Sequence, residues 1–168
     1  MAKSDSFFIR AKTDTNGTTF AQSSVDLGAY VDALGKSVLR IHNISVQYGA
    51  PLESATTTTG NSTETTAFQL TTQSQGAMVG ITDKSVIASG KLSIHSDAST
   101  AIVQSNDNLD VAPQHWTNGY LVGVEQIYLG VDSTVGTASG LTEISIMLEC
   151  TVETLSQSGA MALALSQQ

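Results

Sequence analysis

Charged residues are scarce in this 168-residue sequence, and its cations are confined to one part of the chain. Charged side chains make up 13% of the residues, about half the usual share of a soluble protein. All seven Lys and Arg residues lie at or before Lys91, and the formal net charge is -8. Because nucleic-acid binding draws much of its affinity from Lys and Arg against phosphate, we predict no direct nucleic-acid binding. An acidic surface also repels anionic membrane headgroups.

Other absences exclude further classes of protein. Cys150 is the only cysteine, so no internal disulfide can form. No apolar run approaches the length of a membrane-spanning helix. The first residues, MAKSDSFFIRAK, lack the apolar core of a secretory signal, so we expect no signal peptide. No catalytic or metal-binding motif is complete, and we therefore predict that the protein is not an enzyme and uses no cofactor.

Two short stretches could nevertheless carry a site. Asp107, Asn108 and Asp110 offer oxygen ligands and are candidates for binding calcium, although the Gly and the distal Glu of an EF-hand loop are missing. The alternative is a cluster of Asx turns without a metal. Trp116 is the only tryptophan, and it could form an aromatic ligand platform or anchor a contact between subunits. We favour the subunit contact.

The residues that are present indicate an all-β domain. Short apolar stretches alternate with polar residues and are bounded by Gly, Asp, Asn and Ser, as in sandwiches and barrels. The candidate strands are Ser6–Lys12, Thr18–Val25, Val38–Tyr48, Thr66–Thr72, Ala77–Ile81, Ser85–Ser89, Leu92–His95, Ala101–Gln104, Tyr120–Leu129 and Glu143–Thr154. Two long loops, Gly49–Thr65 and Ser105–Gly119, separate them, and the pattern amounts to about eight strands with almost no helix.

Two of the long strands change phase midway. In Val38–Tyr48, a β-bulge at His42 or Asn43 would keep the apolar side chains on one face. These inward residues are Leu39, Ile41, Ile44, Val46 and Tyr48. The alternative is a strand that is buried on both faces at its middle. Tyr120–Leu129 changes phase in the same way, so we expect a bulge or a sharp bend there.

The strand Glu143–Thr154 alternates without interruption. Cys150 falls on its inward face, where a buried thiol behaves as a small hydrophobic group of low reactivity. We interpret residues 1–154 as a single eight-stranded jelly roll. An immunoglobulin-like sandwich is the second interpretation, but its paired cysteines and tyrosine corner are missing.

Residues 155–168 form a separate tail without a charged residue. Met161, Leu163 and Leu165 alternate there with alanine, and leaving them in water would forgo about 1.5–3 kcal/mol of burial for each large side chain. The tail can fold back on its own barrel as a short helix, or it can contact a neighbouring subunit. We favour the subunit contact through these three residues.

Three segments give the sequence a resemblance to a known family: FFIRAK, VDLGAYVDALGKSVLRIHNISVQY and EISIMLECTVET. The chain resembles the small single jelly-roll major capsid proteins of icosahedral viruses with an internal membrane, the sphaerolipovirus type. The resemblance implies a structural capsid subunit, made in the host cytoplasm and located in the virion. It further implies self-assembly into pseudohexameric capsomers beside a second, larger capsid protein, near an internal membrane but not inserted into it. The alternative is a surface-binding β-sandwich, such as a phage fibre, decoration or adhesin domain.

Overall fold

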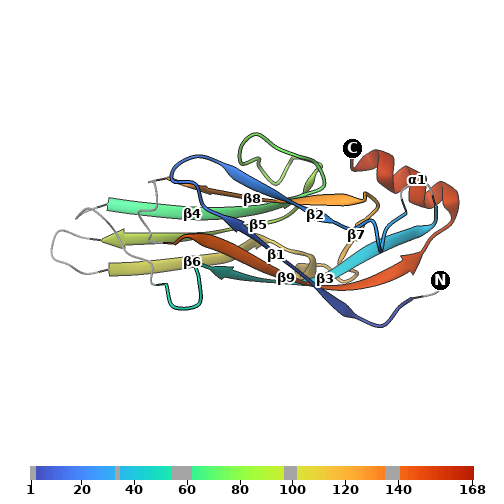
Figure 1. Cartoon of the computed structure of the whole chain (residues 1–168), viewed down its shortest axis with the longest axis horizontal. Helices are drawn as coiled ribbons and strands as arrows, with labels where there is room; N and C mark the ends of the chain where they lie inside the picture. Colours follow the sequence, from blue (N-terminus) through green and yellow to red (C-terminus); the bar gives the residue numbers. More distant parts are fainter. Residues whose placement is uncertain (1–2, 33–34, 54–61, 97–101, 135–140) are drawn as a thin grey trace.

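The chain forms two antiparallel sheets that pack face to face in an elongated sandwich (Figure 1). The computed structural model describes residues 3–32, 35–53, 62–96, 102–134 and 141–168, without the side chains of residues 62, 96 and 102–109. The elements in these ranges are β1 Phe7–Asp14, β2 Ala21–Asp26, β3 Ser37–Tyr48, β4 Ser62–Thr71, β5 Val86–Ser96, β6 Ile102–Val111, the 3₁₀ turn η1 Pro113–His115, β7 Tyr120–Val122, β8 Gln126–Ser133, β9 Glu143–Thr154 and the helix α1 Gln157–Ser166.

The strand order identifies the fold as a jelly roll. One sheet has the order β1-β9-β3-β7, and the other has the order β2-β8-β4-β5-β6. The chain crosses between the sheets repeatedly, so that β1 pairs with β9 and β2 pairs with β8 from the opposite end of the sequence. This wrapping of paired strands around one core is the double-sheet jelly-roll arrangement. The predicted jelly roll is confirmed, and β6 extends the second sheet beside β5 as an additional strand.

The core lies between the two sheets and is built from the inward side chains of both. Buried large side chains on the four-stranded sheet are Leu39, Ile41, Ile44, Ile144, Ile146 and Leu148, and those opposite are Phe68, Leu70, Ile87, Ile127, Leu129 and Val131. Cys150 also faces this core, and burial raises the pKa of its thiol to about 12. The thiol is therefore neutral at pH 7 and packs as an apolar group, as predicted.

The predicted bulge in the long strand β3 is confirmed at His42. The pairing of β3 with β9 shifts between Ile41 and Asn43, which leaves His42 without a partner in the ladder. Leu39, Ile41 and Ile44 are buried, and the half-buried Val46 and Tyr48 pack against the same core. One extra residue thus keeps five apolar side chains on one face of a twelve-residue strand.

The second phase change is a bend between two sheets. The expected bend within Tyr120–Leu129 is present, but the prediction of one strand is wrong, because β7 pairs with β3 and β8 pairs with β2 and β4. Residues 123–125 carry the chain from one sheet to the other. The sequence reads as one apolar strand because both β7 and β8 contribute buried residues to the same core, from opposite sides.

The strand predicted at Ala77–Ile81 does not form either. These residues belong to the connection between β4 and β5, which folds over the outer face of the five-stranded sheet. Gln69 is fully buried beneath it, where its side chain donates to the carbonyl of Ala77 at 3.2 Å and accepts from the amide of Val79 at 2.8 Å. A side-chain amide therefore satisfies backbone groups that a neighbouring strand would otherwise pair.

Both predicted long loops are shorter than expected. β4 begins at Ser62, so the end of the predicted Gly49–Thr65 loop is strand, and Glu64 within it is buried. Residues 54–61 of that loop lie outside the described residues. β6 continues to Val111, which removes the first part of the predicted Ser105–Gly119 loop. β5 joins the predicted strands Ser85–Ser89 and Leu92–His95, because it pairs with β4 along its whole length.

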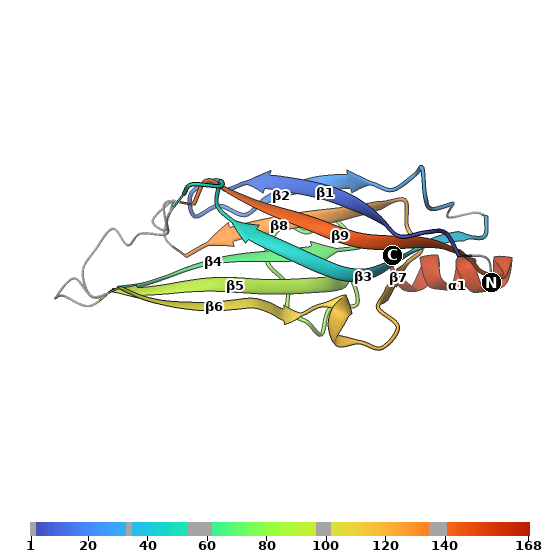
Figure 2. The same cartoon turned by 90° about the horizontal axis from the view of Figure 1, so that it is seen from below.

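The two ends of the sandwich differ. The helix end, named here for α1, also holds the connections at residues 27–32, 112–119 and 123–125 (Figures 1 and 2). The two ends of the 72–85 connection reach it through hydrogen bonds of Thr72, Gln73 and Lys84 to Gln167 and Gln168. The far end holds the β1–β2 turn and the start of β9 (Figure 2). In the part of the chain that the structure describes, no helix is long and apolar enough to span a membrane. The tail 155–168 folds back on its own barrel and contains the helix α1. The subunit contact expected through Met161, Leu163 and Leu165 stays a prediction.

Candidate assembly surfaces

Helix α1 approaches the barrel through its smallest side chains. Ala160 and Ala164 are buried, one turn apart on the same face of the helix. Gly123 lies beneath them, at the crossing between the sheets, and a Cβ atom there would be 3.0 Å from Leu163 Cγ and 3.1 Å from the Ala164 nitrogen. The glycine therefore permits the close contact of the helix with the crossing strand segment.

Gln167, which follows the helix, anchors it by hydrogen bonds. Its side-chain Oε1 accepts from the amide of Gly123 at 2.8 Å, and its Nε2 donates to the carbonyl of Leu121 at 2.7 Å. Its backbone carbonyl accepts from Thr72 Oγ1 at 2.9 Å and from Gln73 Nε2 at 3.1 Å. Because Gln167 is buried, these bonds also offset the cost of removing its polar groups from water.

The largest side chains of the helix face away from the barrel. Met161 is 44% exposed and Leu165 is 68% exposed, and they lie one turn apart on the outward face. Leu163 is half-buried over Gly123, so only two of the three predicted contact residues are presented outward. Since residues 155–168 carry no charge, this outward face is apolar and neutral.

Trp116 lies at the same end of the molecule as α1. It follows η1 and is 41% exposed, with its ring centroid 6.0 Å from that of Tyr120. The Tyr120 hydroxyl in turn lies 3.4 Å from Gln167 Nε2. Tyr30 is also exposed, in another connection of the helix end. The other exposed large apolar residues of the described chain lie elsewhere: Phe8 on β1, Ile81 in the connection over the five-stranded sheet and Leu52 after β3 at the far end. Four of these seven exposed side chains, Tyr30, Trp116, Met161 and Leu165, are therefore at the helix end.

The calcium candidates do not lie in the loop that suggested them. The backbone of Asp107 and Asn108 is in β6, where Asp107 pairs with Lys91, and Asp110 is exposed near the end of the same strand. The side chains of Asp107 and Asn108 are outside the described set. Among the described residues, no three His, Cys, Asp or Glu side chains are grouped so that they could hold a metal ion.

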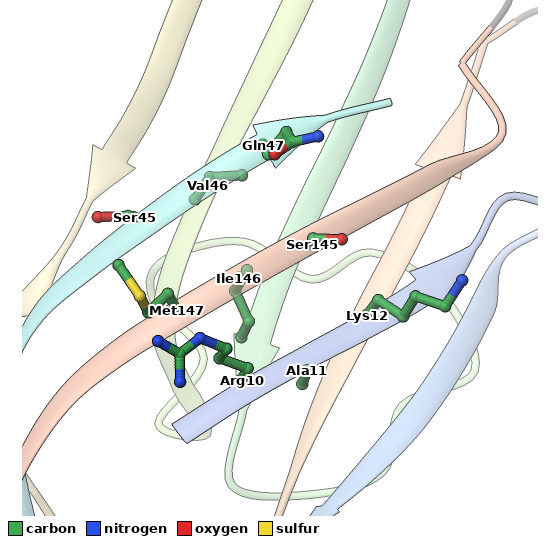
Figure 3. Close-up of a pocket in the computed structure, with 9 residues that line it drawn as sticks. All are labelled: Arg10, Ala11, Lys12, Ser45, Val46, Gln47, Ser145, Ile146 and Met147. Carbon is green, nitrogen blue, oxygen red and sulfur yellow. The ribbon is translucent and has the colours of Figure 1, made fainter. Parts of the chain in front are cut away.

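The outer face of the four-stranded sheet carries a groove, shown in Figure 3. It has a volume of about 600 Å³ and crosses three adjacent strands, β1, β9 and β3. The cross-strand pairing arranges its outward side chains in two rows, Arg10–Met147–Ser45 and Lys12–Ser145–Gln47. Short serine side chains form the low points, and the longer Arg, Lys, Met and Gln side chains form the walls.

A largely buried ion pair, Arg40–Glu153, lies on the same face of the four-stranded sheet, near the helix end. Arg40 Nε and Nη2 donate to the two carboxylate oxygens of Glu153 at 2.6 and 2.8 Å, and Arg40 Nη1 also donates to the carbonyl of Asn118. The hydrogen bonds from Arg40 lower the pKa of Glu153. The bulge residue His42 lies next to the pair, with its Nε2 3.0 Å from Thr151 Oγ1, and burial lowers the pKa of its imidazole.

The two sheets differ in their charges. The four-stranded sheet has three of the seven Lys and Arg residues, Arg10, Lys12 and Arg40, against four acidic residues. The five-stranded sheet has one cation, Lys91, against five acidic residues, of which Glu64 is buried. The alternation of Arg10 and Lys12 along β1 is the one signal in the sequence that places two cations on the same face of a strand. The groove and the Arg40–Glu153 pair could not be predicted without the strand pairing.

Comparisons with known proteins give similarities of fold only. No model of a known protein family matches the chain, and no match is found among curated proteins. VP1 of Trichodysplasia spinulosa-associated polyomavirus, in a complex with sialylated glycooligomers, has a TM-score of 0.49 and 7% identity, over 88% of this chain and 95% of that chain. A VP1 pentamer mutant of Washington University polyomavirus has a TM-score of 0.39 and 8% identity, over 89% of this chain and 93% of that chain. Desmodium yellow mottle tymovirus has a TM-score of 0.33 and 10% identity, over 89% of this chain and 87% of that chain.

All three solved structures are viral, but their TM-scores are below 0.5. The assignment of the jelly roll therefore rests on the strand order of the two sheets.

Proposed function

We propose that this protein is a structural capsid subunit, which assembles with further copies of itself into an icosahedral virus shell. The observation that carries the proposal is the orientation of α1. The helix turns two alanines toward its own barrel and presents Met161 and Leu165 to the outside. An uncharged helix with large apolar residues on its free face is typical of a surface that is covered in an assembly.

Energetics supports this interpretation. Burying each of the two outward side chains in a contact would contribute about 1.5–3 kcal/mol. Two side chains on a ten-residue helix cover far less than the roughly 1,200 Å² of a stable pairwise interface, so a single such contact is weak. Many weak contacts in a closed shell act together, and the assembly is then stable although each pair is not.

The lack of charge on α1 favours its free face as a subunit contact. Copies with a net charge of -8 repel one another, and the neutral apolar face of this helix lets them approach without bringing its own carboxylates together, because it has none. Trp116 lies at the same end, and we propose that it contributes to the contact, because partly exposed Trp residues frequently anchor interfaces. Location in the virion, a second capsid protein and an adjacent internal membrane are further parts of the proposal, supported by the resemblance of the sequence.

Sedimentation velocity over a range of protein concentrations tests the proposal. The double variant Met161→Ser and Leu165→Ser should remain folded and assemble more weakly than the wild type, because its helix retains the buried alanines and Gln167. Leu52→Ser is the matched control, since Leu52 is 98% exposed and lies outside the helix end. It should assemble like the wild type.

Two results would contradict the proposal. One is a wild-type protein that stays monomeric at every concentration, above all if it binds a glycan or a cell surface, as the alternative function requires. The other is an M161S/L165S variant that assembles as well as the wild type, which would remove α1 from the contact.

A further inference from the structure

The groove on the four-stranded sheet contains a cation that is not neutralised within the described part of the chain. Lys12 Nζ lies 2.7 Å from Glu143 and 3.6 Å from Asp14, and Arg40 is paired with Glu153. The Arg10 guanidinium has no hydrogen bond or ion pair with any described residue. It lies 5.9 Å from the ring centroid of Phe8 and is therefore held at the surface by an aromatic neighbour.

The surroundings of Arg10 suit a protein partner. Met147 is its cross-strand neighbour, and Figure 3 shows the two side chains together on one wall of the groove. Phe8, on the same strand, is 52% exposed. A guanidinium can bind a carboxylate with two parallel hydrogen bonds, while Met147 and Phe8 offer apolar area beside it. The groove thus combines one free cation with apolar contact surface, over a floor of small hydroxyl side chains.

A second copy of this chain carries a carboxylate that can pair with Arg10. Asp110 is exposed on the edge strand β6 of the five-stranded sheet, which has five acidic residues and one cation. A contact of the four-stranded sheet with the five-stranded sheet uses two different surfaces, so each copy can continue it to the next. Such a contact closes into a ring if the rotation between copies allows it, as a capsomer requires.

We infer that the groove at Arg10 and Met147 receives the acidic edge of the five-stranded sheet of a second copy, with Arg10 bound to the carboxylate of Asp110. The inference rests on the proposed function and specifies the side-to-side contact within it. It is separate from the contact at the helix end, because the groove crosses β1, β9 and β3 on the outer face of the sheet.

Charge reversal tests the inference in the full-length chain. Arg10→Glu should weaken self-association in sedimentation velocity by about tenfold or more, because an attractive pair at the contact becomes repulsive. Lys36→Glu makes the same change of charge at an exposed residue outside both sheets and should have a much smaller effect. Circular dichroism and thermal unfolding establish that each variant is folded.

A mixing experiment tests the partner. Asp110→Lys alone should also assemble poorly, whereas an equimolar mixture of R10E and D110K should recover assembly. In the mixture, the carboxylate introduced by R10E would face the ammonium introduced by D110K across one contact, and the native pair would form across the next. Two results would overturn the inference and leave the proposed function standing. One is an R10E variant that assembles as well as the wild type, and the other is a mixture of R10E and D110K that does not regain assembly. A wild-type protein that never self-associates would overturn both.

Discussion

Arg40 and Glu153 show how a buried charge is accommodated in this acidic protein. Their side chains are 16% and 9% exposed, and the carboxylate receives two hydrogen bonds from the guanidinium. The pair joins β3 to β9, and through Asn118 it also holds the 112–119 connection against the sheet. Removing one partner would leave the other buried without compensation, which costs more than the intact pair contributes.

The substitution Arg40→Met should therefore lower the free energy of unfolding by about 1.5–3 kcal/mol, the range for hydrogen bonds to charged groups. Lys12→Met is the matched control. Lys12 also pairs with a glutamate, but its side chain is 61% exposed, so its loss should cost about 1 kcal/mol or less. Urea unfolding of both variants checks the order. Equal losses would contradict the importance of burial at Arg40.

The same pair predicts a dependence of stability on acid. The pKa of Glu153 is lowered in the folded protein, so its ionised form stabilises the fold at pH values above the ordinary glutamate pKa of about 4.3. This contribution is lost as the pH falls through the lowered folded-state pKa. The difference in unfolding free energy between the wild type and Glu153→Gln should consequently shrink below about pH 4. A difference that stays constant down to about pH 2 would contradict this assignment.

At the scale of single elements, β3 depends on one inserted residue. His42 is unpaired in the ladder, and the residues before and after it keep their apolar side chains on the core face. Deleting His42 should restore a regular strand in which all five inward residues remain inward. The deletion removes the hydrogen bond between His42 and Thr151, so the free energy of unfolding should fall by about 1 kcal/mol.

Deleting Ser45 instead provides the comparison. It should turn Val46 and Tyr48 away from the core, because a shift by one residue reverses the face of every later side chain. The expected cost is about 1.5–3 kcal/mol for each of the two side chains. Thermal unfolding distinguishes the deletions, and two equally unstable proteins would show that His42 is not a simple insertion.

Helix α1 depends on Gly123 in a comparable way. Gly123→Val should push the helix off the barrel, because even a Cβ atom at this position lies 3.1 Å from the backbone nitrogen of Ala164. Hydrogen exchange should then accelerate in residues 157–166 and remain slow in the β9 strand. Gly76→Val is the control, since no atom lies within 4 Å of a Cβ atom built there. Unchanged exchange in α1 of G123V would contradict the described docking.

These elements also show what the sequence could and could not reveal. The sequence predicts β9 with its observed bounds because apolar and polar residues alternate with a period of two, and burial follows this alternation as far as Cys150. The sequence predicts β7 and β8 as one strand, because the alternation of apolar residues does not show where the chain passes from one sheet to the other. The groove joins residues near positions 10, 45 and 145, and only the pairing register brings these together. The composition of the tail is compatible with a helix folded back on the barrel and with a segment that reaches a neighbouring subunit. The hydrogen bonds of Gln167 hold it on its own barrel as a helix.

At the scale of the whole molecule, the jelly roll separates two kinds of surface. The helix end is apolar at α1 and Trp116, and the outer faces of the two sheets differ in charge. A subunit that uses both surfaces has an axial contact at one end and a lateral contact along its side. Such a subunit can build a closed shell without binding the genome, in agreement with the predicted absence of nucleic-acid binding.

The nucleic-acid prediction can be checked directly. The purified protein should not retard DNA or RNA at physiological ionic strength, because β7, β8, β9 and α1 contain no Lys or Arg and the net charge is -8. Fluorescence anisotropy with labelled oligonucleotides measures this at several salt concentrations. Micromolar affinity that decreases steeply with salt would contradict it.

Single-particle electron microscopy of the concentrated wild-type protein tests the central claim most directly. We predict closed rings or shells built from elongated barrels, in which the α1 faces of neighbouring subunits are covered. Particles that remain single barrels at every concentration, with α1 exposed to solvent, would contradict the proposal that this protein is a capsid subunit.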